Sequence, residues 1–321
     1  MNCRLLFVRL CLALLAAAPL AAAAQTYPSK PVRLIVPVTP GGPPDIGARI
    51  LRQSLSNALG QPVIIENKPG ASQIVGTDYV AKARPDGYTL LQGSANMAIN
   101  AILMPNLPYD TVKDFMPVSL TYLTPYVFVV GAQSKFQSMA ELVKFIRDNP
   151  GKATYGSTGQ GSPQQLATLL FAQTLALPAM TEIQYKGSSA AHPDLISNRI
   201  DFMIDPQAAS SPHIKSGSLR ALAVVTPQRN ANFPNVPTAI EAGVTGYDFA
   251  GWGGVFAPTG TPPDIVLKLN DEVAKALTSP DVRKRFEDLG LVPKSSKPQE
   301  FGDFVIAEMT RWKALLAAKK P

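Results

Sequence analysis

The chain has 321 residues, of which 46% are hydrophobic and 17% are charged, so it can bury a core and intrinsic disorder is excluded. At roughly 100 to 200 residues per domain, this length favours two domains or one large one. The formal net charge of +7 is not concentrated in any block of like charges. The clustered basic stripe of a nucleic-acid-binding protein is therefore absent from the sequence.

Residues 1–24 have the pattern of a signal peptide and contain the chain's two cysteines, Cys3 and Cys11. Basic residues precede a short apolar stretch, and Ala22 to Ala24 supply the small side chains of a cleavage site before Gln25. The alternative is a membrane anchor, but the apolar stretch is too short to span a bilayer and Pro19 interrupts it. The sequence therefore predicts an exported protein whose mature chain begins near Gln25 and has neither thiols nor disulfides.

Strand and helix signals alternate over the first part of the mature chain. The expected elements are a strand over 32–36, a helix over 46–59 with Asp45 as N-cap and Gly60 after its end, a strand over 62–66, a helix over 74–83 and a strand over 88–91. This order is typical of a parallel sheet flanked by helices.

Residues 117–130 form a long apolar stretch with Pro125 near its middle, which indicates a crossing into a second α/β lobe. Further elements are expected as a helix capped by Ser138, a strand over 153–157, a helix capped by Ser162, strands near 182–185, 202–204 and 221–225, an extended return over 251–257, and three C-terminal helices. The predicted division is lobe 1 at 25–123 and 248–321, and lobe 2 at 124–247. The two crossings, 117–130 and 247–256, are expected side by side, with residues 297–321 on lobe 1.

Patterns of catalytic residues are mostly absent from the sequence. It has no G-x-S-x-G motif, and the only histidines, His192 and His213, lack a zinc-binding pattern. Asp201 and Asp205 could share one face of a strand, but an isolated pair is weak support for acid–base chemistry. We therefore expect no enzyme activity, no metal site and no cofactor.

Three loops at predicted strand ends remain as candidate binding elements: 39–45, 93–96 and 157–162. In an open α/β sheet, ligands bind at the carboxyl ends of the strands. The first turn of a helix there offers unpaired N–H groups and a partial positive charge, which together attract carboxylates. Each loop could also be an ordinary turn.

The segment Pro37-Val38-Thr39-Pro40-Gly41-Gly42-Pro43-Pro44-Asp45 resembles the P-x-x-P-G-G-x-x-D signature of the Bug family, the periplasmic solute receptors of tripartite tricarboxylate transporters. The similarity extends from about Tyr27 to Leu316. Its further motifs are Leu59-Gly60-Gln61-Pro62-Val63, Glu66-Asn67-Lys68-Pro69-Gly70-Ala71, Pro85-Asp86-Gly87-Tyr88-Thr89-Leu90, Leu107-Pro108-Tyr109-Asp110, Tyr185-Lys186-Gly187 and Leu219-Arg220-Ala221-Leu222-Ala223-Val224.

The resemblance implies an α/β fold with two lobes, of the type II-like periplasmic-binding-protein kind, and a ligand cleft between them. It implies a periplasmic receptor, expected as a monomer, that captures a small organic carboxylate and delivers it to membrane permease subunits. Presentation of the ligand to a sensor kinase is the alternative, and a periplasmic hydrolase is the least favoured function. The expected ligand-binding residues are Val38, Thr39, Pro40, Gly41, Gly42, Asp45, Ser94, Ala95, Thr158, Gly159, Gly161, Ser162, Gln165, Tyr185, Lys186, Gly187 and Asp205.

Backbone amides after Gly42 and Gly161 are expected to hold the carboxylate, with hydroxyl groups of nearby residues in support. A direct charge pair with Lys186, the only obvious cation near these loops, is the competing arrangement. The chain also departs from the family pattern, and the departures bear on the choice of ligand. They are Val38-Thr39 for Phe-Ala, Ser72-Gln73 for two glycines, Gln165 for a histidine, and Ala190 and His192 for a proline and a leucine.

Overall fold

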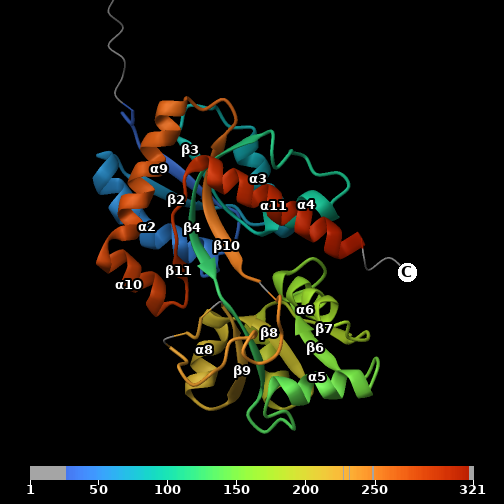
Figure 1. Cartoon of the computed structure of the whole chain (residues 1–321). Coiled ribbons are helices and arrows are strands. Elements are labelled where there is room, and N and C mark those ends of the chain that lie inside the picture. The colour runs from blue at the N-terminus through green and yellow to red at the C-terminus, as the bar shows by residue number, and fades with distance from the viewer. Residues whose placement is uncertain (1–26, 227, 231, 248, 318–321) are drawn as a thin grey trace, which may run out of the picture.

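Two β-sheets, one at each end of the molecule, organise the protein (Figure 1). The computed structural model describes residues 27–317 except 227, 231 and 248, so the predicted signal peptide lies outside the described residues. The first sheet has six strands in the order β11-β4-β10-β3-β1-β2, and the second has five in the order β7-β6-β8-β5-β9. We call each sheet with its helices a lobe.

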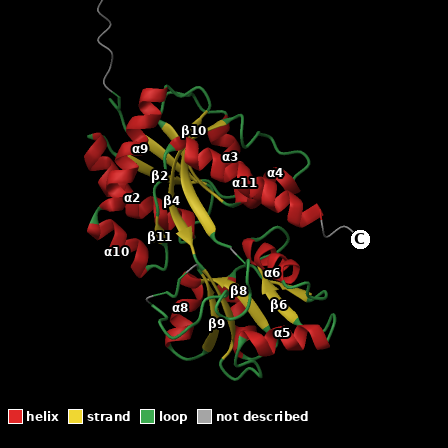
Figure 2. Ribbon diagram, in the orientation of Figure 1, coloured by secondary structure: helices red, strands yellow, loops and turns green. Residues whose placement is uncertain are grey.

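The first lobe is built around a parallel set of strands that alternate with helices. Its elements are β1 (Val32–Val36), α2 (Pro43–Leu59), β2 (Val63–Asn67), η1 (Ala71–Gln73), α3 (Ile74–Ala81), β3 (Thr89–Ser94), α4 (Asn96–Leu103), β4 (Phe115–Thr124), β10 (Gly251–Pro258), α9 (Pro263–Thr278), α10 (Pro280–Asp288), β11 (Val292–Pro293) and α11 (Pro298–Ala317). Helices cover both faces of the sheet (Figure 2). Val32, Leu34 and Val36 pack in the core beneath α2 and α9, whereas Ile35 packs in the core that holds α3, α4 and α11.

The second lobe repeats this arrangement on a smaller scale. Its elements are β5 (Tyr126–Gly131), α5 (Met139–Asp148), β6 (Thr154–Ser157), α6 (Pro163–Thr174), β7 (Thr181–Gln184), α7 (Ser188–Ile196), β8 (Phe202–Pro206), α8 (Gln207–Lys215) and β9 (Leu219–Val225). Ser138 and Ser162 accept hydrogen bonds from the third residue of α5 and α6, which confirms both expected N-caps.

The two crossings between the lobes lie side by side, as expected. β10 pairs antiparallel with β4 from Gly251 opposite Thr124 to Pro258 opposite Phe115. Pro125 alone separates β4 from β5, so the chain changes sheets at a residue that cannot donate to either ladder. Figure 1 shows β4 and β10 running together toward the second lobe. The lobe boundaries at 123/124 and 247/248 stay predictions, and residue 248 lies outside the described part of the chain.

Helix α11 belongs to the first lobe and reaches its junction with the second. Phe301 packs against Phe256 of β10 with the rings tilted and their centroids 4.7 Å apart. Trp312 meets Phe249, which in turn meets Tyr126 at the start of β5, at centroid distances of 5.7 and 4.7 Å. α11 therefore packs on lobe 1 as predicted, although on the sheet face opposite α2.

Three helices and one helix start differ from the sequence-based prediction. α4, α7 and α8 were not expected, and α2 begins at Pro43 with Gly42 as its N-cap instead of Asp45. Asp45 is the third helical residue because the chain already turns into the helix at Pro43 and Pro44, whose fixed φ suits a first turn. Among the described residues, no helix combines the length and apolar character needed to cross a bilayer.

Candidate functional site

The loop after β1 is held by the carboxylate of Asp45, whose side chain is 3% exposed. Its Oδ2 accepts from the Gly41 N–H at 3.0 Å and from Arg49 Nε at 2.8 Å, and its Oδ1 accepts from Asn67 Nδ2 at 2.8 Å. Asn67 also donates to the Val38 carbonyl oxygen, so the ends of β1 and β2 are joined. Burial raises the pKa of Asp45, but the bonds from Arg49, Asn67 and Gly41 outweigh it and hold the pKa below its ordinary value.

Both carboxylate oxygens of Asp45 therefore accept hydrogen bonds from residues of the protein around this loop. One of its donors is the backbone N–H of Gly41, as expected, and the other two are the side chains of Arg49 and Asn67. Thr39, Pro40 and Gly41 are exposed beside it and Gly42 is half-buried. Within the described chain, the Gly42 N–H has no hydrogen-bond partner.

The loops after β2 and β3 meet at the same edge of the first sheet. Ser94, the last residue of β3, donates from Oγ to Oε1 of Gln73 at 2.8 Å. The N–H of Ala95 donates to the carbonyl oxygen of Trp252 at 3.3 Å. Ser94 and Ala95 are both buried beneath these loops, and the Ala95 N–H already has a hydrogen-bond acceptor.

The loop between β6 and α6 is supported from below by Glu182 of β7. Ser157 Oγ and Gln165 Nε2 donate to the two Glu182 oxygens at 2.5 and 2.7 Å. Gln165 Oε1 accepts from the Gly161 N–H at 2.7 Å, and Ser157 Oγ accepts from the Gly159 N–H at 3.0 Å. The Gly161 N–H is therefore occupied by a side chain of the same loop, whereas the expected binding by amides after Gly161 stays a prediction.

Gly161 has a different structural task. Its φ of +73° suits glycine, and a Cβ added there would lie 2.4 Å from Leu103 Cδ1 and 3.6 Å from Ile99 Cγ2 of α4. The second-lobe loop therefore rests directly on the helix that follows β3 in the first lobe. This contact places the loop 157–162 against the C-terminal half of α4.

Other residues of the second-lobe loop have polar groups that are either used within the loop or free to bind a ligand. Thr158 Oγ1 donates to Gln164 Oε1 at 2.9 Å, and Ser162 Oγ accepts from the Gln165 N–H at 3.3 Å. Within the described residues, the N–H groups of Thr158 and Gln160 make no hydrogen bond. Gln160 is exposed and Thr158 is half-buried. Gln160 was absent from the sequence-based set, because a single exposed glutamine carries no distinguishing signal.

Tyr185, Lys186 and Gly187 follow β7, but they do not act as one group. Tyr185 donates its hydroxyl to Asp194 at 2.8 Å on α7, and burial together with Asp194 raises the pKa of Tyr185 to about 12. Lys186 is exposed, and Gly187 precedes α7. The Tyr185 hydroxyl is therefore committed to the second lobe's own packing.

Asp205 is the clearest correction to the expected site. It has no exposed surface, and it accepts hydrogen bonds from Ser188, His192 and Ser210 at 2.5, 3.0 and 2.5 Å. Its carboxylate joins α7 and α8 to β8 inside the second lobe, so we do not include Asp205 in the proposed ligand site. Among the described residues, no group of three His, Cys, Asp or Glu side chains could hold a metal ion.

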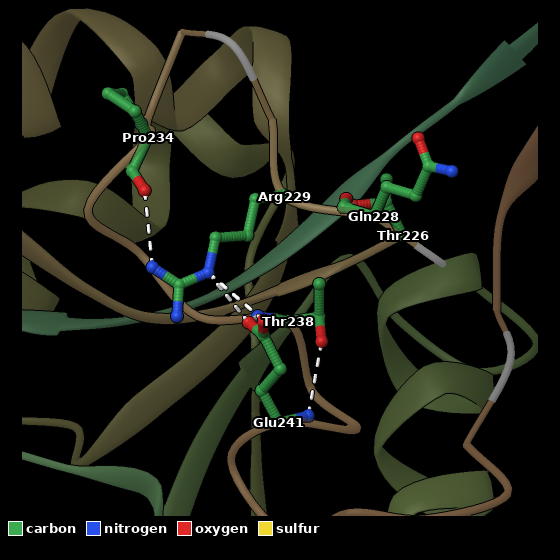
Figure 3. Close-up of polar contacts among 6 residues, drawn as sticks. All are labelled: Thr226, Gln228, Arg229, Pro234, Thr238 and Glu241. Carbon is green, nitrogen blue, oxygen red and sulfur yellow. Dashed lines mark hydrogen bonds and ion pairs between the residues drawn. The ribbon is translucent and has the colours of Figure 1, made fainter.

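A hollow of about 1240 Å³ lies at the junction between the lobes but contains none of the expected site residues. One wall is the segment after β9, where Arg229 donates to Glu241 and to the carbonyl oxygen of Pro234 (Figure 3). The charged side chains lining the hollow are Arg229, Glu287, Asp288, Lys294, Glu300, Glu308 and Arg311. Because acids outnumber bases here, and Arg229 and Arg311 already pair with Glu241 and Glu308, this hollow is poorly suited to an anion.

Comparison with known proteins identifies the family of the chain. Residues 47–320 match the family described as tripartite tricarboxylate transporter family receptor, TctC. The chain is 39% identical over 298 residues to Protein BugT of Bordetella pertussis, an alignment that covers 92% of this chain and 90% of the relative.

Two solved structures show the same fold with ligands bound. Rpa4515 of R. palustris with adipate has a TM-score of 0.80 and 36% identity, covering 90% of this chain and 97% of that one. MatC (Rpa3494) from Rhodopseudomonas palustris with bound malate has a TM-score of 0.77 and 32% identity, covering 90% and 99%. The chain thus belongs to the TctC family of solute-binding receptors, to which the Bug proteins also belong, and it is a receptor with the two-lobe periplasmic-binding-protein fold and not an enzyme.

Proposed function

We propose that this protein is exported to the periplasm, captures a small organic carboxylate between its lobes and delivers it to the permease of a tripartite transporter. The observation that carries the proposal is the contact of Gly161 with α4, which joins the loop after β6 in the second lobe to the helix after β3 in the first. Adipate and malate in two relatives support the ligand class.

The ligand carboxylate is bound chiefly by main-chain N–H groups at the rims of these loops. The amides of Gly42 and Gln160 come from different lobes, and neither has a partner among the described residues. One hydrogen bond to a charged group contributes about 1.5–3 kcal/mol. Several such bonds exceed the roughly −8 kcal/mol of micromolar affinity before the costs of ordering and lobe closure are subtracted.

A titration of the purified mature protein with glutarate, adipate, malate and citrate tests the ligand class. A ligand at 100 times its dissociation constant adds about 2.7 kcal/mol of stability, which a thermal-shift assay detects. The acid should be recovered unchanged after saturation, as expected of a receptor. If none of the four acids shifts the transition, this carboxylate assignment fails.

Gly42 allows a direct test of the main-chain amide. Its φ of −76° is one that proline can adopt, so Gly42→Pro removes the N–H with little change in that torsion. Gly42→Ala is the matched control, because an added Cβ would meet only ordinary contacts, the nearest at 3.5 Å. We expect Gly42→Pro to weaken carboxylate binding about 10- to 150-fold, which corresponds to one charged hydrogen bond, and Gly42→Ala to leave it within twofold.

The competing arrangement is a charge pair between the ligand and Lys186, and the salt dependence of binding distinguishes it from binding by main-chain amides. If Lys186→Ala abolishes binding, and binding to the unaltered protein falls steeply between 50 and 500 mM NaCl while Gly42→Pro has no effect, a cation holds the carboxylate. Transport and export have their own tests: uptake of the labelled acid by cells lacking the receptor gene, and mass spectrometry of the mature N-terminus near Gln25.

A further inference from the structure

The turn between β2 and α3 has an unusual backbone conformation. Ala71, Ser72 and Gln73 have φ angles of 45°, 53° and 79°, and they follow Gly70 at 138°. Residues with a Cβ rarely adopt the left-handed region, and three in succession store strain. Such strain persists only where surrounding structure enforces it, and it concentrates at ligand clamps and active sites.

Two hydrogen bonds enforce this conformation from the neighbouring helices. Asn100 of α4 donates from Nδ2 to the Ser72 carbonyl oxygen at 2.9 Å, and Thr77 of α3 donates from Oγ1 to the Gln73 carbonyl oxygen at 2.8 Å. Asn100 and Thr77 are both buried, so their own polar groups depend on these acceptors. The main chain of the turn is thereby fixed to α3 and α4.

The side chain of Gln73 is oriented by Ser94 at the end of β3. Ser94 Oγ donates to Gln73 Oε1, so the amide oxygen is used and the Nε2 group faces elsewhere. Within the described residues, this Nε2 group makes no hydrogen bond, and Gln73 is only partly buried. A side-chain donor with two N–H groups therefore stands beside Ser94, at the sheet edge whose helix α4 supports the second-lobe loop.

We propose that Gln73 is a specificity-determining residue: its amide N–H groups donate to an oxygen of the bound carboxylate or of a hydroxyl next to it. The inference rests on the proposed function and names the chemistry that this corner of the site selects. A ligand with an acceptor oxygen there is favoured over one that presents an ammonium or amide N–H. The hydrogen bond from Ser94 orients the Gln73 amide, and the left-handed turn places Gln73 beside Ser94.

The test compares Gln73→Glu with the unaltered protein. Glutamate has nearly the same shape and keeps an acceptor for Ser94, but it loses the donor and gains a negative charge. Gln73→Met removes both polar atoms without adding charge. Ser72→Ala changes the neighbouring position of the same turn and serves as the matched control, since the Ser72 hydroxyl makes no hydrogen bond among the described residues.

Calorimetric titrations use whichever of glutarate, adipate, malate or citrate binds the unaltered protein most tightly, together with the monoamide of the same acid. We expect Gln73→Glu to weaken binding of the acid at least 30-fold, Gln73→Met about 10-fold and Ser72→Ala less than twofold. The ratio of affinities for acid and monoamide should fall at least 10-fold in Gln73→Glu, because a carboxylate at this position accepts from the amide of the ligand.

The outcomes separate the two proposals. If the unaltered protein binds none of the four acids, the proposed function fails and this inference falls with it. If it binds one of them, and Gln73→Glu weakens acid and monoamide equally or leaves both unchanged, then Gln73 only supports Ser94. The receptor function then stands and the specificity role is refuted.

Discussion

Replacing Asp45 by alanine should cost more stability than the loss of an ordinary helix cap. A cap substitution costs about 0.5–2 kcal/mol. Asp45 instead makes three hydrogen bonds from a side chain that is 3% exposed, and the side chain of its charged partner Arg49 is 49% exposed. The Arg49 pair is screened by water and contributes no more than about 1 kcal/mol. The bonds from Gly41 and Asn67 contribute about 1.5 kcal/mol each at the lower end of the range for charged acceptors, giving roughly 3 to 4 kcal/mol in total.

Urea unfolding followed by circular dichroism measures this loss. Arg49→Gln is the matched control, since it removes the exposed pair with Asp45 and the Arg49–Asn67 hydrogen bond but keeps the bonds that Gly41 and Asn67 donate to Asp45. At about 2 °C per kcal/mol for a chain of this size, Asp45→Ala should also melt about 6 to 8 °C lower. Because the folded state lowers the pKa of Asp45, its contribution is complete above the unfolded pKa and is lost as the pH falls through the folded one. The difference between variant and parent should therefore shrink below pH 4. A loss for Asp45→Ala no larger than that for Arg49→Gln would refute this account of the loop.

Three further predictions concern the strained turn, a buried carboxyl and the contact between lobes. Ser72→Gly should raise the free energy of unfolding by about 0.5–1 kcal/mol, because relief of the left-handed strain exceeds the entropic cost of glycine; a lower urea midpoint would contradict this. Burial raises the pKa of Glu308, so its stabilising effect is complete below the unfolded pKa and declines as the pH rises through the folded one. Glu308→Gln should therefore gain stability over the parent between pH 4 and pH 8, whereas a gap that does not change with pH would contradict it. Gly161→Ala should lower the free energy of unfolding by about 1–3 kcal/mol, since φ is +73° and Leu103 Cδ1 lies 2.4 Å from the new Cβ. Adding Leu103→Ala to this variant should recover part of that loss. If the losses of the two single variants simply add in the double variant, the contact is excluded.

The sequence predicts elements best where a cap or a regular apolar stripe marks them. Ser162 before Pro163 locates the start of α6, and Gly60, at φ +66°, locates the end of α2. Helix α4 lacks such a signal, because Met97, Ala98, Ile99 and Asn100 are all buried and no polar face alternates with them. A helix surrounded by neighbours loses the amphipathic pattern on which prediction depends.

Proline misleads at α7 and α8 for a related reason. Pro193 and Pro212 each lie inside a nine-residue helix, where sequence rules place a break. In helices this short, few intrahelical bonds exist for a proline to remove, and packing against β8 and β9 outweighs its cost. At α2 the prediction gave too little weight to proline. Asp45 is a preferred cap residue, but Pro43 and Pro44 before it were the stronger sign of a first turn.

The position of the candidate loops follows from the sequence, since parallel strands bring their carboxyl ends to one edge. The groups left free for a ligand do not follow from it. The amide of Gly161 looks available in the sequence, yet Gln165, four residues later, accepts from it in the folded loop. Asp205 looks equally available, yet Ser188, His192 and Ser210 enclose it. Both outcomes depend on side-chain rotamers and on contacts between helices, which local spacing does not encode.

The way Glu182 is bound decides which side of the loop can receive an anion. Its two oxygens accept from Ser157 and Gln165, so these donors point down toward β7 and away from the loop rim. A negative charge beneath the loop repels a carboxylate placed deep in it, and Coulomb repulsion in a partly buried site is strong enough to matter. A ligand carboxylate is therefore expected at the rim, where the free amide of Gln160 lies, and not against the Gly161 amide. In the first lobe the corresponding acid, Asp45, is offset by Arg49, which leaves that loop without the same repulsion. This difference in charge supports the view that Gly42 and Gln73 of the first lobe supply the tighter half of the carboxylate site.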